Sequence, residues 1–424
     1  MSAPRWRWVG LLSATAIASY LARVNITVAG EQIMREFALT QPQMGRVFSA
    51  FVLGYALAMI PGGALADRWG TRRVLVGAAV VWTLVTGAIA GVGLGMGLGV
   101  GLGMGLGKPL GELLGLRFLL GVGEAPTFPA AALGISRWIP SAAQGRANGL
   151  VLAAIGVGSA IAPPLITWLM THWGWRVAMI VTAIPAAIVG LLWHAVREPT
   201  STSSPNRPVV AEPLAEPYSE QSPEQYPASL RTRSFSLLTL SYTLQGYVGY
   251  IFVFWFYLYL VQERHFALLE SAWLASLPWV FSIVSIPAGG WISDRLAAGR
   301  LGLVWGRRMV PLVSLVGGGI MLALGAATSN AYLAAGYLAC STAAVLAVEG
   351  PFWATMLSVS GRRAGTAGGI MNMGSNIGGF ISPALTPVLA AAIGWERALD
   401  VAAALAVVAG LLWLGVTPRG EARS

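Results

Sequence analysis

The sequence is poor in charged residues and contains almost no cysteine or histidine. Charged residues make up 10% of the 424 positions, whereas soluble globular chains have about 25%. Hydrophobic residues make up 56% and the mean hydropathy is +0.67, so the chain cannot cover a water-exposed surface. This composition excludes an aqueous enzyme and a disordered chain. The single cysteine, Cys340, excludes an internal disulfide and a cysteine-based metal site, and three histidines leave little for zinc.

The few charges are mostly basic, with 27 Lys and Arg against 17 Asp and Glu and a net charge of +10. A basic excess can indicate nucleic-acid binding, but in membrane proteins it often lies in cytoplasmic loops. We therefore expect the lipid bilayer, and no nucleic acid, as the partner of this surface.

Long apolar runs account for most of the chain. A membrane-spanning helix needs roughly 20 mostly apolar residues. The predicted fold class is an all-α integral membrane protein with twelve transmembrane helices. The first is not a cleaved signal peptide, because it contains Arg23 and Asn25. The predicted spans cover residues 8–30, 43–65, 74–91, 112–132, 147–169, 177–196, 235–260, 272–291, 309–328, 333–357, 367–392 and 398–416.

Positive charge sets the predicted orientation. With both termini in the cytoplasm, 19 of the 27 basic residues fall in cytoplasmic segments and six fall on the outer side. Lys and Arg are enriched in the cytoplasmic loops of membrane proteins. We therefore expect a multi-pass protein of the cell inner (plasma) membrane with both termini in the cytoplasm.

The chain divides into two sets of six predicted spans. Residues 197–233 are rich in Pro, Ser and Glu, which predicts a flexible cytoplasmic linker between an N-terminal bundle, 1–196, and a C-terminal bundle, 234–424. The bundles share residues at a spacing of 220, as in the parallel six-helix repeats of transporters. Identical pairs include Pro163/Pro383, Gly174/Gly394 and Trp175/Trp395. The glycine-rich tract 93–107 is predicted to be a low-complexity loop, with a strand-like insert as the alternative.

Two motifs point to a family. Residues 63–73, GALADRWGTRR, resemble the loop motif between the second and third helices of the major facilitator superfamily. Residues 117–126, RFLLGVGEAP, resemble the fourth helix of its anion:cation symporter family, which includes bacterial hexonate and hexarate carriers and animal carriers of sialic acid, glutamate and phosphate. The resemblance implies the major facilitator fold, two pseudo-symmetric six-helix bundles, and a carrier of organic anions.

The first span departs from the bacterial members of that family, which commonly carry Asp-Arg there. Ala22 stands where the Asp would be, before Arg23, and the string 20–25 is more similar to the sialic acid carrier branch. The departure leaves the number of transported protons open.

Four charged residues lie well inside predicted spans: Arg23, Arg117, Glu124 and Glu349. A charge at the bilayer centre costs ~2.5–3.5 kcal/mol on insertion scales, so it normally faces a cavity or a partner. The guanidinium fork binds a carboxylate bidentately, which predicts Arg23 and Arg117 as substrate-binding residues. A structural ion pair or a snorkelling group is the alternative. Arg117 and Glu124 share a helix face at a separation of roughly 10 Å, too far for a good salt bridge.

The two glutamates are predicted to couple transport to protons. Burial disfavours the charged form of a carboxyl group, so Glu124 can exchange a proton near neutral pH; the alternative is a buried carboxyl paired with Arg117. Glu349 precedes Gly350 and Pro351, which indicates a broken helix. For Glu349, a structural role stands beside a role as ligand or as the second proton site.

Further polar residues complete the predicted site. Those at the loop edges are expected to hold the inward gate: Asp67, Arg68, Arg72, Asp294 and Arg295. Those inside spans are candidates for the substrate pocket, with helix packing as the alternative: Tyr55, Gln245, Tyr250, Asn372 and Asn376.

These residues predict a secondary carrier that moves a small organic anion together with protons by alternating access. We expect a monomer with no cofactor, because no Walker loop indicates ATP and no catalytic constellation is present. A phosphate or organophosphate antiporter could use the same two arginines. A drug exporter or a non-transporting membrane receptor is a weaker alternative.

Overall fold

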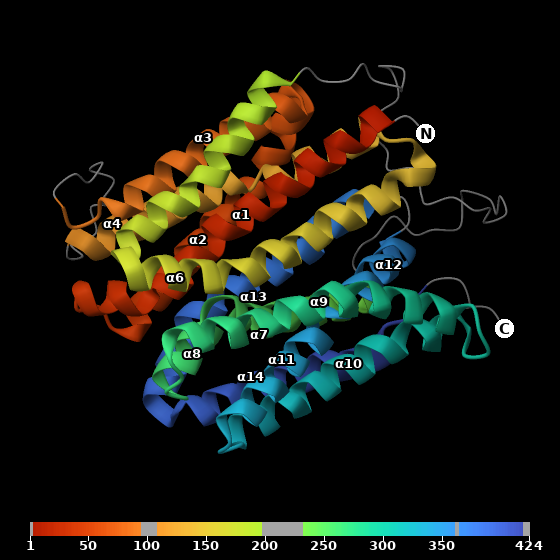
Figure 1. The fold of residues 1–424 in the computed structure, drawn as a ribbon. Coiled ribbons are helices and arrows are strands. Elements are labelled where there is room, and N and C mark those ends of the chain that lie inside the picture. The colour runs from red at the N-terminus through yellow and green to blue at the C-terminus, as the bar shows by residue number, and fades with distance from the viewer. Residues whose placement is uncertain (1–2, 95–107, 197–231, 361–363, 419–424) are drawn as a thin grey trace.

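The computed structural model describes residues 3–94, 108–196, 232–360 and 364–418, whose regular secondary structure is helical (Figure 1). Most of the tract 93–107 and of the linker 197–233 lies outside the described residues. The helices are α1 (Ala3–Glu36), α2 (Gln41–Trp69), α3 (Thr71–Ala90), α4 (Lys108–Glu124), α5 (Thr127–Trp138), α6 (Ser141–Ala195), α7 (Arg233–Phe254), α8 (Phe256–Gln262), α9 (Leu268–Ala297), α10 (Gly302–Ala327), α11 (Ala331–Leu346), α12 (Glu349–Ser360), α13 (Ala364–Ile393), α14 (Trp395–Leu412) and η3 (Trp413–Gly415).

The prediction of twelve transmembrane helices is confirmed. The described residues contain eleven helical stretches that are long and apolar enough to cross a membrane. One of these, Ala143–Ala195, holds two crossings, because α6 turns at Gly174, where φ is 81° and ψ is 165°. Gly394 joins α13 to α14 with nearly the same angles, 85° and 156°. Glycine adopts this positive φ without steric cost, which explains why the pair Gly174/Gly394 repeats in the sequence.

The helices form two groups that lie side by side (Figure 1). In the first half, α1 and α3 pack against α6 and α2 packs against α4; in the second half, α7 packs against α13, and α10 packs against α11 and α14. The halves meet where α2 packs on α13 and α6 packs on α9. We call the end where α1 begins and α14 ends the terminal end, and the opposite end the distal end (Figure 1).

The two halves are packed closely toward the distal end, where α2 begins. A Cβ atom on Gly45 would lie 2.1 Å from the Pro383 carbonyl oxygen, so the backbones of α2 and α13 touch. One turn later, the Ser49 hydroxyl donates to the Phe380 carbonyl at 2.6 Å. The Phe48 ring stacks on Phe254 with 5.2 Å between centroids. Together these three contacts close the interface between the halves on the distal side.

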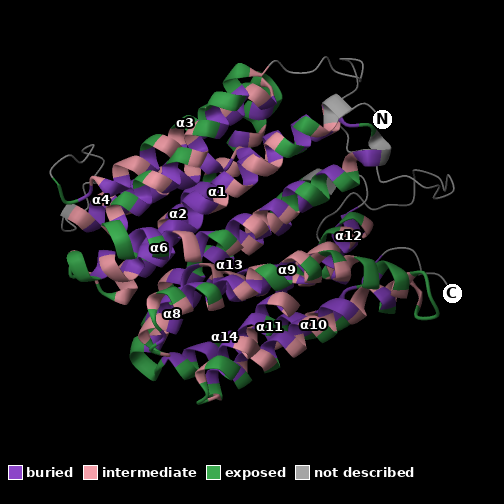
Figure 2. Cartoon of the chain, in the orientation of Figure 1, coloured by how far each residue is buried: buried purple, intermediate pink, exposed green. Residues whose placement is uncertain are grey.

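Toward the terminal end, the same helices are more exposed. On α2, Phe48 and Phe51 are at most 1% exposed, whereas Ile60 is 72% and Trp69 is 52% exposed. Figure 2 shows buried residues between the helices and exposed residues along their outward faces and ends. Many of the exposed side chains are large and apolar, such as Leu191 on α6. Lipid tails are the natural cover for such a surface.

Candidate transport site

A helix break places Glu124 inside the first half. Helix α4 ends at Glu124 and α5 begins at Thr127, because Pro126 lacks an N–H group and its ring clashes with the preceding turn. The sequence analysis predicted one continuous span over 112–132. The structure instead divides this crossing at Ala125 and Pro126, and the Glu124 carboxyl lies at the division.

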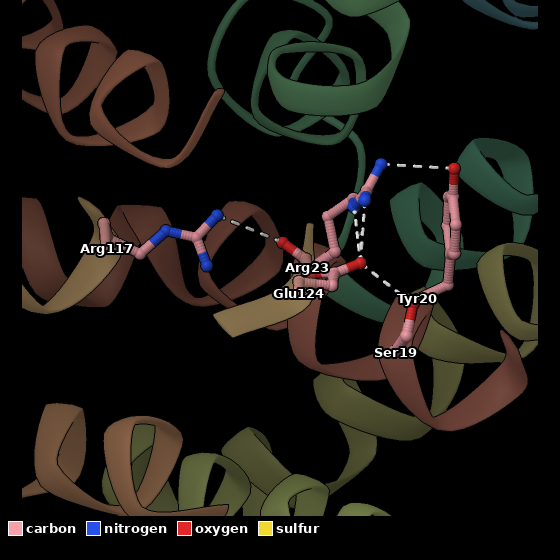
Figure 3. Close-up of polar contacts among 5 residues, drawn as sticks. All are labelled: Ser19, Tyr20, Arg23, Arg117 and Glu124. Atoms are coloured by element: carbon pink, nitrogen blue, oxygen red, sulfur yellow. Dashed lines mark hydrogen bonds and ion pairs between the residues drawn. The ribbon is translucent and has the colours of Figure 1, made fainter. Parts of the chain in front are cut away.

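Glu124 forms a buried ion pair with Arg23 of α1 (Figure 3). The Glu124 Oε1 atom accepts from Arg23 Nη2 at 2.7 Å and from Arg23 Nε at 3.1 Å. The Ser19 hydroxyl donates to the same oxygen at 2.8 Å. The Arg23 and Glu124 side chains are only 6% and 1% exposed. Removing one partner of a buried ion pair leaves the other as an uncompensated charge. An anion that binds Arg23 would therefore leave the Glu124 carboxylate without its cation.

Arg117 lies beside this pair without joining it. Its Nη2 atom donates to the Arg23 carbonyl at 3.4 Å, and its guanidinium lies over the Phe51 ring at 4.6 Å. The Arg117 Nε and Nη1 atoms and Glu124 Oε2 are buried without a hydrogen-bond partner. As predicted, Arg117 and Glu124 form no salt bridge. Arg117 is fully buried in this conformation, so its predicted contact with substrate requires the surrounding helices to move.

Aromatic rings surround the Arg23 guanidinium. Its Cζ atom lies 4.5 Å from the Tyr20 ring centroid, 5.0 Å from that of Phe51 and 4.9 Å from that of Tyr55. Arg23 Nη1 also donates to the Tyr20 hydroxyl at 3.2 Å. The sequence analysis selected Tyr55 but not Tyr20 or Ser19. Their spacing from Arg23, three and four residues on one helix, is the signal that could have found them.

A second glutamate occupies a helix break in the second half. Helix α11 ends at Leu346 and α12 begins at Glu349, which agrees with the predicted break. The Tyr242 hydroxyl donates to Glu349 Oε2 at 2.8 Å, and Gln245 Nε2 donates to Glu349 Oε1 at 3.2 Å. Both donors lie on α7. The structure therefore brings the predicted residues Gln245 and Glu349 together and adds Tyr242.

The remaining pocket candidates differ in their surroundings. Tyr250, in the last turns of α7, is partly exposed and stacks on Phe254. Asn376 donates to the Asn372 carbonyl within α13 at 2.9 Å, and Asn372 Nδ2 contacts Met59 Sδ of the first half at 3.0 Å. In this conformation the two asparagines therefore make helix and interhelix contacts, and their predicted role in binding stays a prediction.

The predicted gate residues lie at the terminal end. Arg72 donates to the carbonyls of Trp193 and His194 at the end of α6, and the Arg295 guanidinium lies over the Trp291 ring. Asp294 pairs with Arg307 of α10 within its own half. Asp67 and Arg68 are exposed. These contacts lie inside each half, and a gating role for this set stays a prediction.

The sequence was compared with known families and proteins. A profile described as Major Facilitator Superfamily matches residues 11–356. This chain belongs to the Major Facilitator Superfamily. The predicted resemblance is thereby confirmed, including its anion:cation symporter branch, and the chain is a multi-pass membrane protein of a transporter family, not an enzyme.

The relatives of this superfamily member match along nearly their whole length. A Cupriavidus necator protein described as "Probable sulfoacetate transporter SauU" is 30% identical over 97% of this chain and 93% of its own. The hexuronate transporter of Bacillus subtilis is 26% identical over 94% of this chain and 92% of its own. The D-galactonate transporter of Escherichia coli is 26% identical over 97% and 95%.

Solved structures of the superfamily share the fold. A bacterial homologue of the human lysosomal transporter Spinster, in an inward-facing and occupied conformation, has a TM-score of 0.78 and 18% identity over 98% of this chain and 97% of that chain. Its inward-facing and unoccupied form has the same TM-score and 19% identity. These matches support the major facilitator fold of two pseudo-symmetric six-helix bundles.

Proposed function

We propose that this carrier takes up a small organic anion, of the sugar acid class, together with a proton. The buried ion pair between Arg23 and Glu124 is the observation that carries the proposal. The relatives named for hexuronate, D-galactonate and sulfoacetate support an anionic substrate. The terminal end would face the cytoplasm, and the distal end the outside.

Competition for Arg23 would couple the two movements. A substrate carboxylate that binds the Arg23 guanidinium displaces the Glu124 carboxylate from it. Glu124 is then a buried charge with less compensation, which is costly until it takes up a proton. Substrate binding and protonation therefore favour each other, as linked equilibria must.

The charge of the site is conserved in this exchange. Before binding, the positive Arg23 and the negative Glu124 cancel. After binding, the positive Arg23 and the substrate carboxylate cancel, and Glu124 is neutral. One proton per carboxylate thus lets the loaded and empty sites cross the membrane with the same charge. Arg117 lies on α4 about two helical turns before Glu124. Its positive charge stays the same in both states and attracts the anion.

Glu124→Gln tests the proposal. Glutamine keeps the size of the side chain and imitates the protonated acid, but it cannot release a proton. In proteoliposomes, D-gluconate uptake driven by a pH gradient should collapse, whereas exchange of D-gluconate at equal pH should persist. Glu263→Gln, in the loop after α8, is the control and should keep both activities.

The result also separates the alternative function. If Glu124→Gln still concentrates D-gluconate when a proton gradient is imposed, Glu124 does not couple transport to protons. Uptake by the native protein that is independent of pH and strongly stimulated by internal phosphate would replace the proposal with an antiporter of phosphate or organophosphates.

A further inference from the structure

The two halves carry the same polar cluster around a glutamate. Ser19, Tyr20 and Arg23 of α1 correspond to Ser241, Tyr242 and Gln245 of α7 at a spacing of 222 residues. The segment Glu124-Ala125-Pro126 corresponds to Glu349-Gly350-Pro351 at a spacing of 225. In each half the residue three places after the tyrosine donates to a glutamate at a helix break. The other contacts differ: Tyr242 donates to Glu349 whereas Tyr20 accepts from Arg23, and Ser19 donates to Glu124 whereas Ser241 donates to the Ala409 carbonyl.

The clusters differ at the residue that faces the glutamate. Arg23 gives Glu124 a cationic partner, whereas Gln245 gives Glu349 only an amide. Within the described residues, no ion pair involves Glu349. Its two oxygens accept separate hydrogen bonds, from Tyr242 and from Gln245. A carboxylate accepts at both oxygens, so these two donors can hold an ionised Glu349 without a cation.

Glu349 faces the same space as the Arg23 cluster. Glu349, Tyr20 and Tyr250 keep partial exposure although they lie within the helical crossings, whereas Glu124 is 1% exposed. The carboxyl groups of Glu124 and Glu349 both interact electrostatically with the hydroxyls of Tyr20 and Tyr250. Tyr20 lies on α1 and Tyr250 on α7, and these two helices contact each other across the two halves. An anion held by Arg23 extends from the first cluster toward the second.

We propose that Glu349 recognises the end of the substrate that lies opposite its carboxylate. It accepts a hydrogen bond from a hydroxyl group there and repels a second anionic group. The site therefore selects sugar acids with one carboxylate, such as D-gluconate, against those with a carboxylate at both ends, such as D-glucarate. The two acids differ only at carbon six. This inference rests on the proposed function, because it needs an anion bound at Arg23.

Binding of the two acids to purified protein tests the inference. Isothermal titration of native protein is expected to show D-glucarate binding at least about tenfold more weakly than D-gluconate, because like charges placed together at a binding site are costly. Glu349→Gln removes the charge and keeps an acceptor oxygen. The ratio should fall to within about threefold, mainly through tighter D-glucarate binding, since the repulsion is gone.

Glu263→Gln is the control, because it removes one carboxylate from the exposed loop after α8. It should leave the affinities for both acids, and their ratio, unchanged. A ratio that Glu349→Gln leaves unchanged, or native protein that binds both acids equally, would overturn the role of Glu349 while organic-anion transport stands. Native protein that binds neither acid would reject the sugar acid class itself, and this inference with it.

Discussion

The two halves of the carrier have the same plan and differ in the partner of one glutamate. In the first half, Arg23 and Glu124 form a buried ion pair, and we propose that a substrate carboxylate replaces Glu124 in it. In the second half, Glu349 receives only neutral donors. The comparison shows how two halves with the same helix arrangement can have different roles. In the transport proposed above, one cluster exchanges its ionic partner, and the other recognises the far end of the anion.

The regions after the second and eighth crossings can be compared in the same way, because they share one arginine contact and one exposed acid. Arg72 of α3 donates to Trp193 and His194 at the end of α6, and Arg308 of α10 donates to the Val416 carbonyl after η3 at 2.7 Å. Both arginines thus bind the last carbonyls of their half. Both loop acids are exposed, and Asp294 pairs with Arg307.

Arg23→Gln makes the first cluster like the second and should have the largest effect. Removing one partner of a buried ion pair costs about 3–5 kcal/mol, and here it also removes the group proposed to hold the carboxylate. We expect D-gluconate uptake into proteoliposomes to fall at least about 100-fold, the equivalent of roughly 3 kcal/mol. Arg35→Gln is the control, since its pair with Glu31 is at the surface. Uptake within twofold of native would exclude Arg23 from the site.

Arg117→Lys keeps the charge of the first cluster but replaces a planar fork with a point charge. Lys cannot bind a carboxylate bidentately, so we expect binding of D-gluconate to weaken about tenfold or more if Arg117 contacts the anion. Titration of folded protein measures this, and a parallel Arg23→Lys variant compares the two arginines. Normal affinity in Arg117→Lys would leave Arg117 a purely structural or long-range electrostatic role.

Gln245→Arg makes the second cluster like the first. The new guanidinium would pair with Glu349 and cancel its charge, so D-glucarate should bind about three- to tenfold more tightly than to native protein. Gln245→Leu removes the amide donor without adding a charge and should not improve D-glucarate binding. Equal behaviour of the two variants would show that the difference between the clusters is not one of charge.

Asp67→Asn and Asp294→Asn compare the two loops and should have the smallest effects. Asp67 lies far from the site, so its loss should change the balance between open states and reduce turnover about two- to threefold, with affinity unchanged. Asp294→Asn breaks a pair whose carboxyl is 66% exposed and should change turnover less. Transport rate and ligand affinity in the same preparation separate the effects. A large loss of affinity in Asp67→Asn would contradict its place at a gate.

The crossings could be predicted from sequence because apolar length alone identifies them. Twelve runs gave twelve crossings, and the repeated Gly174 and Gly394 marked two of the turns. The interior of the crossings was harder to predict. The break at Glu349 was expected from Gly350 and Pro351, whereas no break was predicted at Ala125 and Pro126. One proline alone is an ambiguous signal, because Pro61 lies inside α2 without ending it.

The charged members of the site could be predicted, but their partners could not. Arg23, Glu124 and Glu349 stood out because a charge in an apolar run is costly. That Glu124 pairs with Arg23 depends on how α1 and α4 face each other, and 101 residues separate the two positions in the chain. Ser19, Tyr20 and Tyr242 carry no charge and are common residue types in membrane helices, so composition gave no reason to select them.

The backbone contact between Gly45 and Pro383 has a consequence for the energy of opening. Within the described residues, no ion pair joins the halves on the distal side. The hydrogen bonds from Ser49 to Phe380 and from Gln41 to Gln262 are between neutral groups. A neutral hydrogen bond contributes only about 1 kcal/mol net, and water can take over both groups when the helices part. The outer seal therefore rests mainly on apolar packing, such as that of Phe48 on Phe254, and added salt should leave its opening equilibrium unchanged.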